Sequence, residues 1–95
     1  MKYRTKNAGI EAFQMTEERG SDNVDWPEWL NRAWQFEENE TGALYILSHL
    51  PRTLAIRTPE GPMVVSWGDY IVHFGGAELY PCKPDIFEAS YEEVT

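Results

Sequence analysis

The sequence predicts an α+β fold in which a curled, mostly antiparallel sheet of about five or six short strands carries one amphipathic helix. A single stretch with helical spacing of apolar residues lies in the first half of the chain, and short alternating runs fill most of the rest. Turn-forming residues recur about every eight residues, which is too close for the crossover helices of a parallel sheet. The 95 residues have the length of one domain, 1–95.

The first strand is expected from Ala8 to Met15, where the residues alternate between two faces. Neither face is purely polar, so we expect both faces of this strand to be partly covered. The polar residues 16–23 are expected to form a loop.

The helix is expected to begin after Asp25, which forms a capping box with Glu28 and has Pro27 in its first turn. The expected helix carries one apolar stripe along its length, made of Trp26, Trp29, Leu30, Ala33 and Trp34. Such a stripe typically covers a sheet. An aromatic cage or a docking face is the alternative.

The rest of the chain is expected to be mainly strands, beginning after an acidic loop at 37–42. The expected strands are Ala43–His49, Thr53–Thr58, Met63–Trp67, Tyr70–Phe74 and one that starts with Ala77–Tyr80. The turns between them contain Pro51, residues 59–62, Gly68-Asp69 and Gly75-Gly76. Near the C-terminus we expect a helical turn opened by Asp85 and anchored by Ile86 and Phe87, followed by an edge strand at 90–94.

The composition argues against several classes of protein. Sixteen acidic residues against eight basic ones give a net charge of −8, which disfavours direct nucleic-acid binding and favours a basic protein partner. Imitation of nucleic acid is the alternative reading of this charge. The one cysteine excludes an internal disulfide, and no cysteine–histidine cluster or phosphate-binding glycine loop is present, so no metal or cofactor is expected. No apolar run has the length of a signal sequence or a membrane span, so we expect a cytoplasmic protein without membrane association.

Several motifs occur in order along nearly the whole chain. They are Ile10-Glu11-Ala12-Phe13-Gln14, the helix start at 26–29, the hairpin Thr58–Met63, Gly68-Asp69-Tyr70-Ile71, and the box Tyr80-Pro81-Cys82-Lys83-Pro84-Asp85-Ile86-Phe87. In these motifs the chain resembles a family of small proteins encoded by tailed bacteriophages and prophages. Trp67 stands where that family usually has proline, and residues 73–76 also depart from its pattern. The resemblance implies a phage or prophage accessory protein in the bacterial cytoplasm and supplies no catalytic residues.

Cys82 could be a nucleophile, a metal ligand or a packing residue. Lys83 beside it could stabilise a thiolate, but no cysteine–histidine–asparagine spacing supports a protease. Pro81 and Pro84 fix the backbone on both sides, which favours a rigid corner in which Cys82 fills a small gap.

The candidate binding residues are Trp67, Asp69, Tyr80, Cys82, Lys83 and Asp85. Asp69 is expected to cap nearby N–H groups, because no partner for a catalytic or metal-binding carboxylate is visible. Lys83 is expected to project into solvent. His49 and His73 lie in unrelated segments, and His73 shares a strand face with Ile71, so no acid–base pair can be argued from spacing.

The leading hypothesis is a non-enzymatic protein that binds a host or phage protein through exposed aromatic residues, for example Trp67 or a helix tryptophan. The alternative is a small-ligand, nucleotide-like binder that uses Arg52, Arg57 or the basic arm Lys2, Arg4 and Lys6. An enzyme using Cys82 is a third hypothesis. Exposed strand edges can pair with those of a second copy, so a homodimer is also compatible with the sequence.

Overall fold

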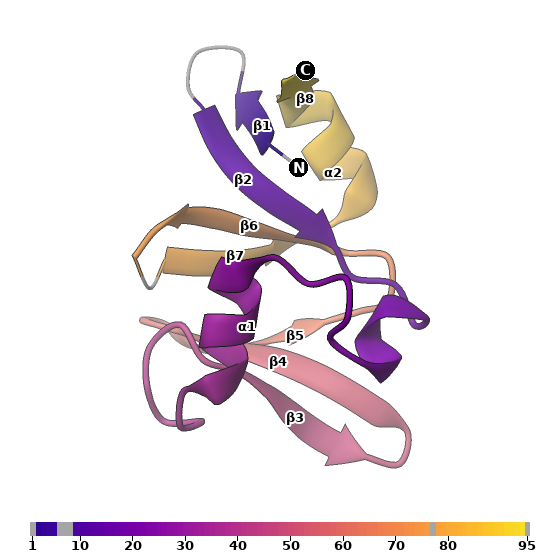
Figure 1. Cartoon of the computed structure of the whole chain (residues 1–95), viewed down its shortest axis with the longest axis vertical. Coiled ribbons are helices and arrows are strands. Elements are labelled where there is room, and N and C mark those ends of the chain that lie inside the picture. The colour runs from indigo at the N-terminus through magenta and orange to yellow at the C-terminus, as the bar shows by residue number, and fades with distance from the viewer. Residues whose placement is uncertain (1, 6–8, 77, 95) are drawn as a thin grey trace.

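The computed structural model describes the backbone of residues 2–5, 9–76 and 78–94 and the side chains of residues 10–76 and 78–91. These residues form two antiparallel sheets and two α-helices, which confirms the predicted α+β class and the antiparallel pairing (Figure 1). The expected single curled sheet with one helix is instead a five-stranded sheet and a three-stranded sheet. The expected residues Lys6, Ala8 and Ala77 lie outside the described part of the chain.

The five-stranded sheet has the strand order β7-β6-β2-β1-β8. Its strands are β7 (Glu78–Cys82), β6 (Tyr70–Gly75), β2 (Gly9–Gln14), β1 (Lys2–Thr5) and β8 (Tyr91–Val94). The edge position of β8 agrees with the edge strand expected at 90–94. The sequence interpretation missed β1, which it treated as a basic arm and which pairs with both β2 and β8.

The three-stranded sheet is a meander of β3 (Leu44–His49), β4 (Arg52–Thr58) and β5 (Gly61–Val65). As expected for its turn, Gly61 has a positive φ of 116°. The Gly68-Asp69 turn also forms, with φ of 99° at Gly68, but it is not a hairpin turn. It leads from β5 in one sheet to β6 in the other, where β6 pairs with β2.

The helix α1 (Glu28–Gln35) starts later than the capping box predicted. Pro27 occupies the N-cap position with extended backbone and no side-chain cap bond, so the predicted role of Asp25 is wrong. Trp26 precedes a proline, which disfavours helical backbone at Trp26 and places the helix start after Pro27. The Trp26 indole Nε1 donates to the carbonyl of Arg19 at 2.8 Å, in the short 3-10 helix η1 (Arg19–Ser21).

The main core lies between the two sheets and α1, and a second cluster lies beneath α2 (Pro84–Ser90). The main core contains Met15, Leu30, Leu44, Leu54, Ile56, Val65, Ile71 and Leu79, with Trp26 and Ala33. Phe87 anchors α2 in the second cluster, as expected, whereas Ile86 is 57% exposed and anchors nothing there. Lys83 and not Asp85 stands at the N-cap of α2, and no side chain caps it.

Candidate functional site

The turn at Asp69 and the proline-fixed corner at Lys83 meet in space. The Asp69 side chain is buried, and its Oδ2 accepts a hydrogen bond from the Ser66 backbone N–H at 2.9 Å. The Lys83 ammonium lies 3.3 Å from Oδ1 and 3.4 Å from the Ser66 hydroxyl. The capping role predicted for Asp69 is therefore confirmed. Lys83 is exposed, as expected, with more than half of its side chain accessible, but its ammonium also contacts Asp69, which the sequence did not predict.

Trp67 lies at the start of the same turn and packs against the main core. A Cβ atom on Gly20 would lie 2.6 Å from Cη2 of the Trp67 ring. The indole therefore fills the space that a side chain at position 20 would need. The backbone of the turn is bonded to the end of β2, because Met15 N–H donates to the Asp69 carbonyl and Gly68 N–H donates to the Met15 carbonyl. Trp67 is thus half-buried, and its packing is structural.

Cys82 is half-buried in the second cluster, packed against its members near Tyr70 and Phe87. Burial, followed by the nearby charges of Asp69 and Asp85, raises the pKa of the Cys82 thiol above its ordinary value of 9.0. Because the thiolate is the nucleophilic form, this surrounding works against an activated cysteine. The arrangement supports the packing interpretation of Cys82.

The six predicted binding residues therefore do not form one site. Asp69 and Lys83 contact each other, and Trp67 and Cys82 lie near them. Tyr80, two residues before Cys82 on β7, instead contacts Phe74, edge-on with ring centroids 6.1 Å apart. The arrangement at Asp69 is best described as a brace that joins β2, β6 and the start of α2.

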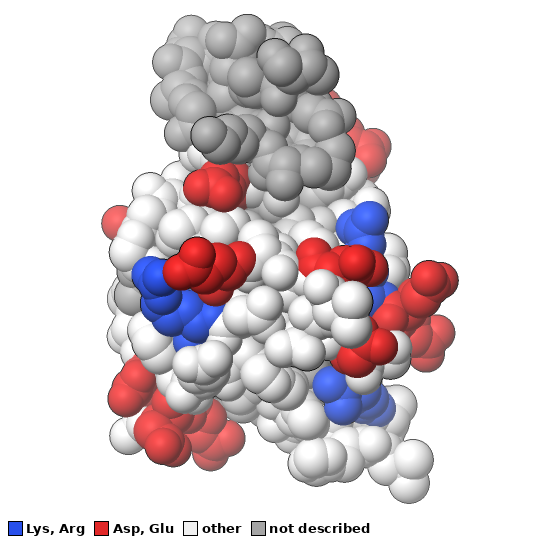
Figure 2. Space-filling view, viewed as in Figure 1, with Lys and Arg blue, Asp and Glu red and all other residues white. Residues whose placement is uncertain are grey.

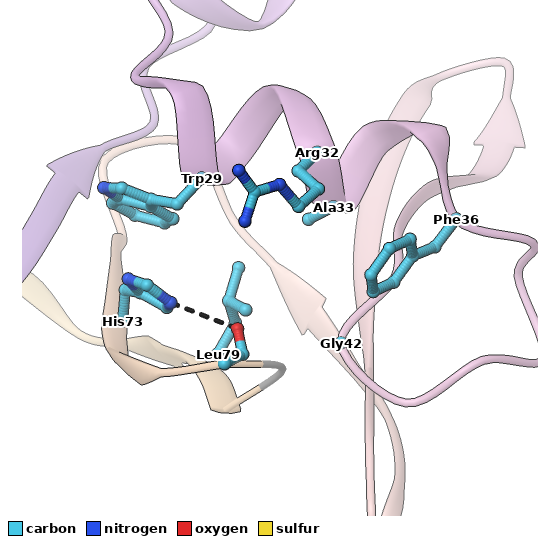
Figure 3. A pocket seen from close by; sticks show the side chains of 8 residues that line it. Trp29, Arg32, Ala33, Phe36, Gly42, His73 and Leu79 are labelled. Atoms are coloured by element: carbon cyan, nitrogen blue, oxygen red, sulfur yellow. Dashed lines mark hydrogen bonds between the residues drawn. The ribbon is translucent and has the colours of Figure 1, made fainter.

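A different place on the surface has the features of a binding site. A pocket of about 70 Å³ lies between α1 and the turn from β6 to β7 (Figure 3). Its lining consists of Trp29, Arg32, Ala33, Phe36, Gly42, His73, Gly76 and Leu79. Aromatic and aliphatic groups form its walls, and none of the lining residues is acidic.

One wall of the pocket is a stack of two rings from different elements. The Trp29 indole lies on the His73 imidazole with centroids 4.8 Å apart and planes 13° from parallel. His73 Nε2 lies 3.1 Å from the Gly76 carbonyl oxygen, and because a carbonyl can only accept, Nε2 donates this bond. This bond holds the imidazole in place beneath Trp29 (Figure 3).

Arg32 provides the charge at this pocket. Its guanidinium extends from α1 toward the space beside Trp29 and above Leu79 (Figure 3). Nη2 bonds to Glu28 Oε1 at 2.9 Å, one helical turn earlier, with both side chains mainly exposed. A solvent-exposed pair of this kind contributes little and exchanges readily. Guanidinium has five N–H donors, so donors remain for a second acceptor.

Two other pockets include residues of η1 in their lining. The larger, of about 600 Å³, contains Glu18, Asp22 and Asp25 against the single base Arg19. The smaller, of about 200 Å³, lies between Trp26, Trp34 and Arg52. Arg52 Nε donates to the Gly20 carbonyl there.

The sequence interpretation considered Trp29 and His73 separately and did not bring them together, and it missed Arg32 and Phe36. One signal was available. His73 shares its strand face with Ile71, and Ile71 lies in the core that α1 covers. A residue two positions further along that face is therefore directed toward the helix.

Among the described residues, no group of three histidine, cysteine or acidic side chains could hold a metal ion. In the same part of the chain, neither helix has the length and apolar character needed to cross a membrane.

Comparison with known proteins adds no assignment to this geometry. No family model, no curated protein and no solved structure matches the chain.

Proposed function

We propose that this protein is a non-enzymatic accessory protein of phage or prophage origin that binds a host or phage protein in the bacterial cytoplasm. The observation that carries the proposal is the pocket of Trp29, Arg32 and His73. Its volume of about 70 Å³ suits one side chain. Sites for drug-sized molecules occupy about 300–1,000 Å³. Tryptophan and arginine are also the residues most enriched among the energetic centres of protein interfaces.

The charge of the chain supports a protein partner with a basic surface. Acidic side chains gather at several places on the face drawn in Figure 2, and basic side chains lie beside them. With a net charge of −8, the long-range field attracts a basic protein and increases its rate of association. This attraction is screened as salt is added.

A nucleotide-like ligand is less well supported. The pocket with enough volume, about 600 Å³, contains three carboxylates, which repel phosphate. Arg52 and Arg57 each donate one N–H to backbone, to the Gly20 and Glu38 carbonyls, and neither lines this larger pocket. The side chains of the basic arm Lys2, Arg4 and Lys6 lie outside the described residues.

The test is affinity capture with the tagged protein from bacterial lysates, with and without phage infection. We expect a protein that is retained by the wild type and lost by Trp29→Ala. Phe74→Ala is the matched control, because Phe74 is an aromatic residue of β6 that is 49% exposed and does not line the pocket. The candidate partner is then purified, and its binding is measured by calorimetry at low and high salt. Equal binding by the wild type and folded Trp29→Ala would contradict the proposal.

A further inference from the structure

We infer that the Trp29–Arg32–His73 pocket takes a carboxylate, supplied by an aspartate or glutamate side chain of the partner protein. This inference rests on the proposed function and names the group that enters the site. It begins from the charge of the pocket, which differs from that of the chain. Of the acidic side chains that the structure describes, none lines this pocket, whereas both other pockets described above contain acidic residues.

Arg32 is the residue that holds the carboxylate. Its guanidinium faces the pocket and is contacted at Nη2 by Glu28, whose side chain is 86% exposed. A planar guanidinium binds carboxylates through paired N–H donors, and this geometry distinguishes a carboxylate from an amide. Glu28 does not line the pocket, but its carboxylate occupies one guanidinium donor and so competes with the partner's acidic group.

The walls explain why an amino-acid side chain is the occupant. The methylene groups of an aspartate or glutamate would pack against the Trp29 ring and Leu79, while the carboxylate reaches Arg32 at the mouth. His73 is held by its bond to Gly76 and supports the Trp29 ring from below. The volume of about 70 Å³ leaves room for one such side chain. A partner with a basic surface would be attracted by the net negative charge of the chain, and one acidic residue at the centre of that surface would enter this pocket.

The experiment uses the side chain alone as probe. N-acetyl-glutamate α-amide is titrated into ¹⁵N-labelled protein, and the Trp29 indole N–H and Arg32 side-chain N–H signals are followed by NMR. N-acetyl-glutamine α-amide, which has the same shape without the charge, is the control probe. We expect saturable shifts with the glutamate probe at a Kd of about 1–10 mM and no saturation with the glutamine probe.

Three variants sharpen the result. Arg32→Gln removes the guanidinium and should abolish the shifts, whereas Arg19→Gln removes an exposed arginine outside the pocket and should leave them unchanged. Glu28→Gln removes the competing carboxylate and should tighten probe binding by about 2- to 5-fold. Equal binding of both probes, or unchanged binding by folded Arg32→Gln, overturns the carboxylate assignment, as does the absence of saturable shifts with the wild type. If the carboxylate assignment fails while Trp29→Ala still loses the captured partner, the protein-binding function stands with another kind of anchor.

Discussion

Asp69 Oδ1 and Lys83 Nζ lie 3.3 Å apart, and the aspartate is buried while the lysine is mainly exposed. This asymmetry separates two contributions to stability. The carboxylate also accepts the Ser66 backbone N–H, so its removal leaves a partly buried donor without its partner. The ammonium is solvated on the outer side, where a single ion pair contributes little.

Asp69→Ala should therefore lower the free energy of unfolding by about 1–3 kcal/mol. Lys83→Met should lower it by less than about 1 kcal/mol, because the ammonium is largely exposed. Urea unfolding followed by circular dichroism measures both values. A larger loss for the lysine variant than for the aspartate variant would show that the ion pair and not the backbone cap holds this turn.

Gly20→Ala should lower the free energy of unfolding by about 1–3 kcal/mol, because the new methyl group meets the Trp67 ring and forces it to move. Tryptophan fluorescence and urea unfolding report the displacement and the loss. The control is a double-mutant cycle with Trp67→Leu. In that background the added methyl group should have a much smaller effect, and an unchanged penalty would exclude a clash with the indole.

Phe87→Ala should lower the free energy of unfolding by about 3–5 kcal/mol. The Phe87 ring is buried and stacks on Tyr70 at 4.0 Å and on Tyr91 at 4.8 Å between centroids. Ile86→Ala, one residue earlier and 57% exposed, should change it by less than about 0.5 kcal/mol. Similar losses in thermal or urea unfolding for the two variants would disprove the anchoring role of Phe87.

The raised pKa of Cys82 predicts a loss of stability in alkali. The folded state holds the thiol proton more tightly than the unfolded state, so this contribution is complete below the ordinary pKa of 9.0. It is lost as the pH rises through the higher pKa of the folded protein. As the pH is raised above 9.0, the wild type should lose more free energy of unfolding than Cys82→Ala does. Parallel pH curves for the two proteins would contradict this assignment of the raised pKa.

The local elements could be predicted because their signals are local. The turns at Gly61, Gly68 and Gly75 form with positive φ values, as expected for residues without a side chain. The start of α1 could not be read correctly from Asp25, because the residue before a proline is disfavoured in a helix and Pro27 itself has extended backbone at the N-cap. Residues 24 and 25 instead form a turn, and the Trp26 indole donates to the Arg19 carbonyl.

The division into two sheets and the composition of the pocket depend on long-range pairing. Alternation shows which side chains of β6 share a face, but it does not show that β6 pairs with β2 and leaves β5 in another sheet. The Trp29–His73 stack depends on this choice, because it follows from where β6 lies relative to α1. The sequence alone therefore placed the candidate binding residues around Cys82. The pocket could not be predicted, because it depends on how the two sheets are arranged.

The bonds between Met15 and the Gly68-Asp69 turn have a consequence for the folding rate. These bonds close a loop of residues 16–67, whose two ends lie side by side where β2 ends and β6 begins. The loop includes α1 and the whole three-stranded sheet. The Gln14 side chain bonds to the Gly68 carbonyl across 54 positions of sequence. Joining two strands at this separation requires closure of a long loop before the β2–β6 ladder can form, and such non-local pairing slows folding. Refolding should therefore be limited by the arrival of β6 at β2, after the β3–β4–β5 meander has formed from neighbouring strands.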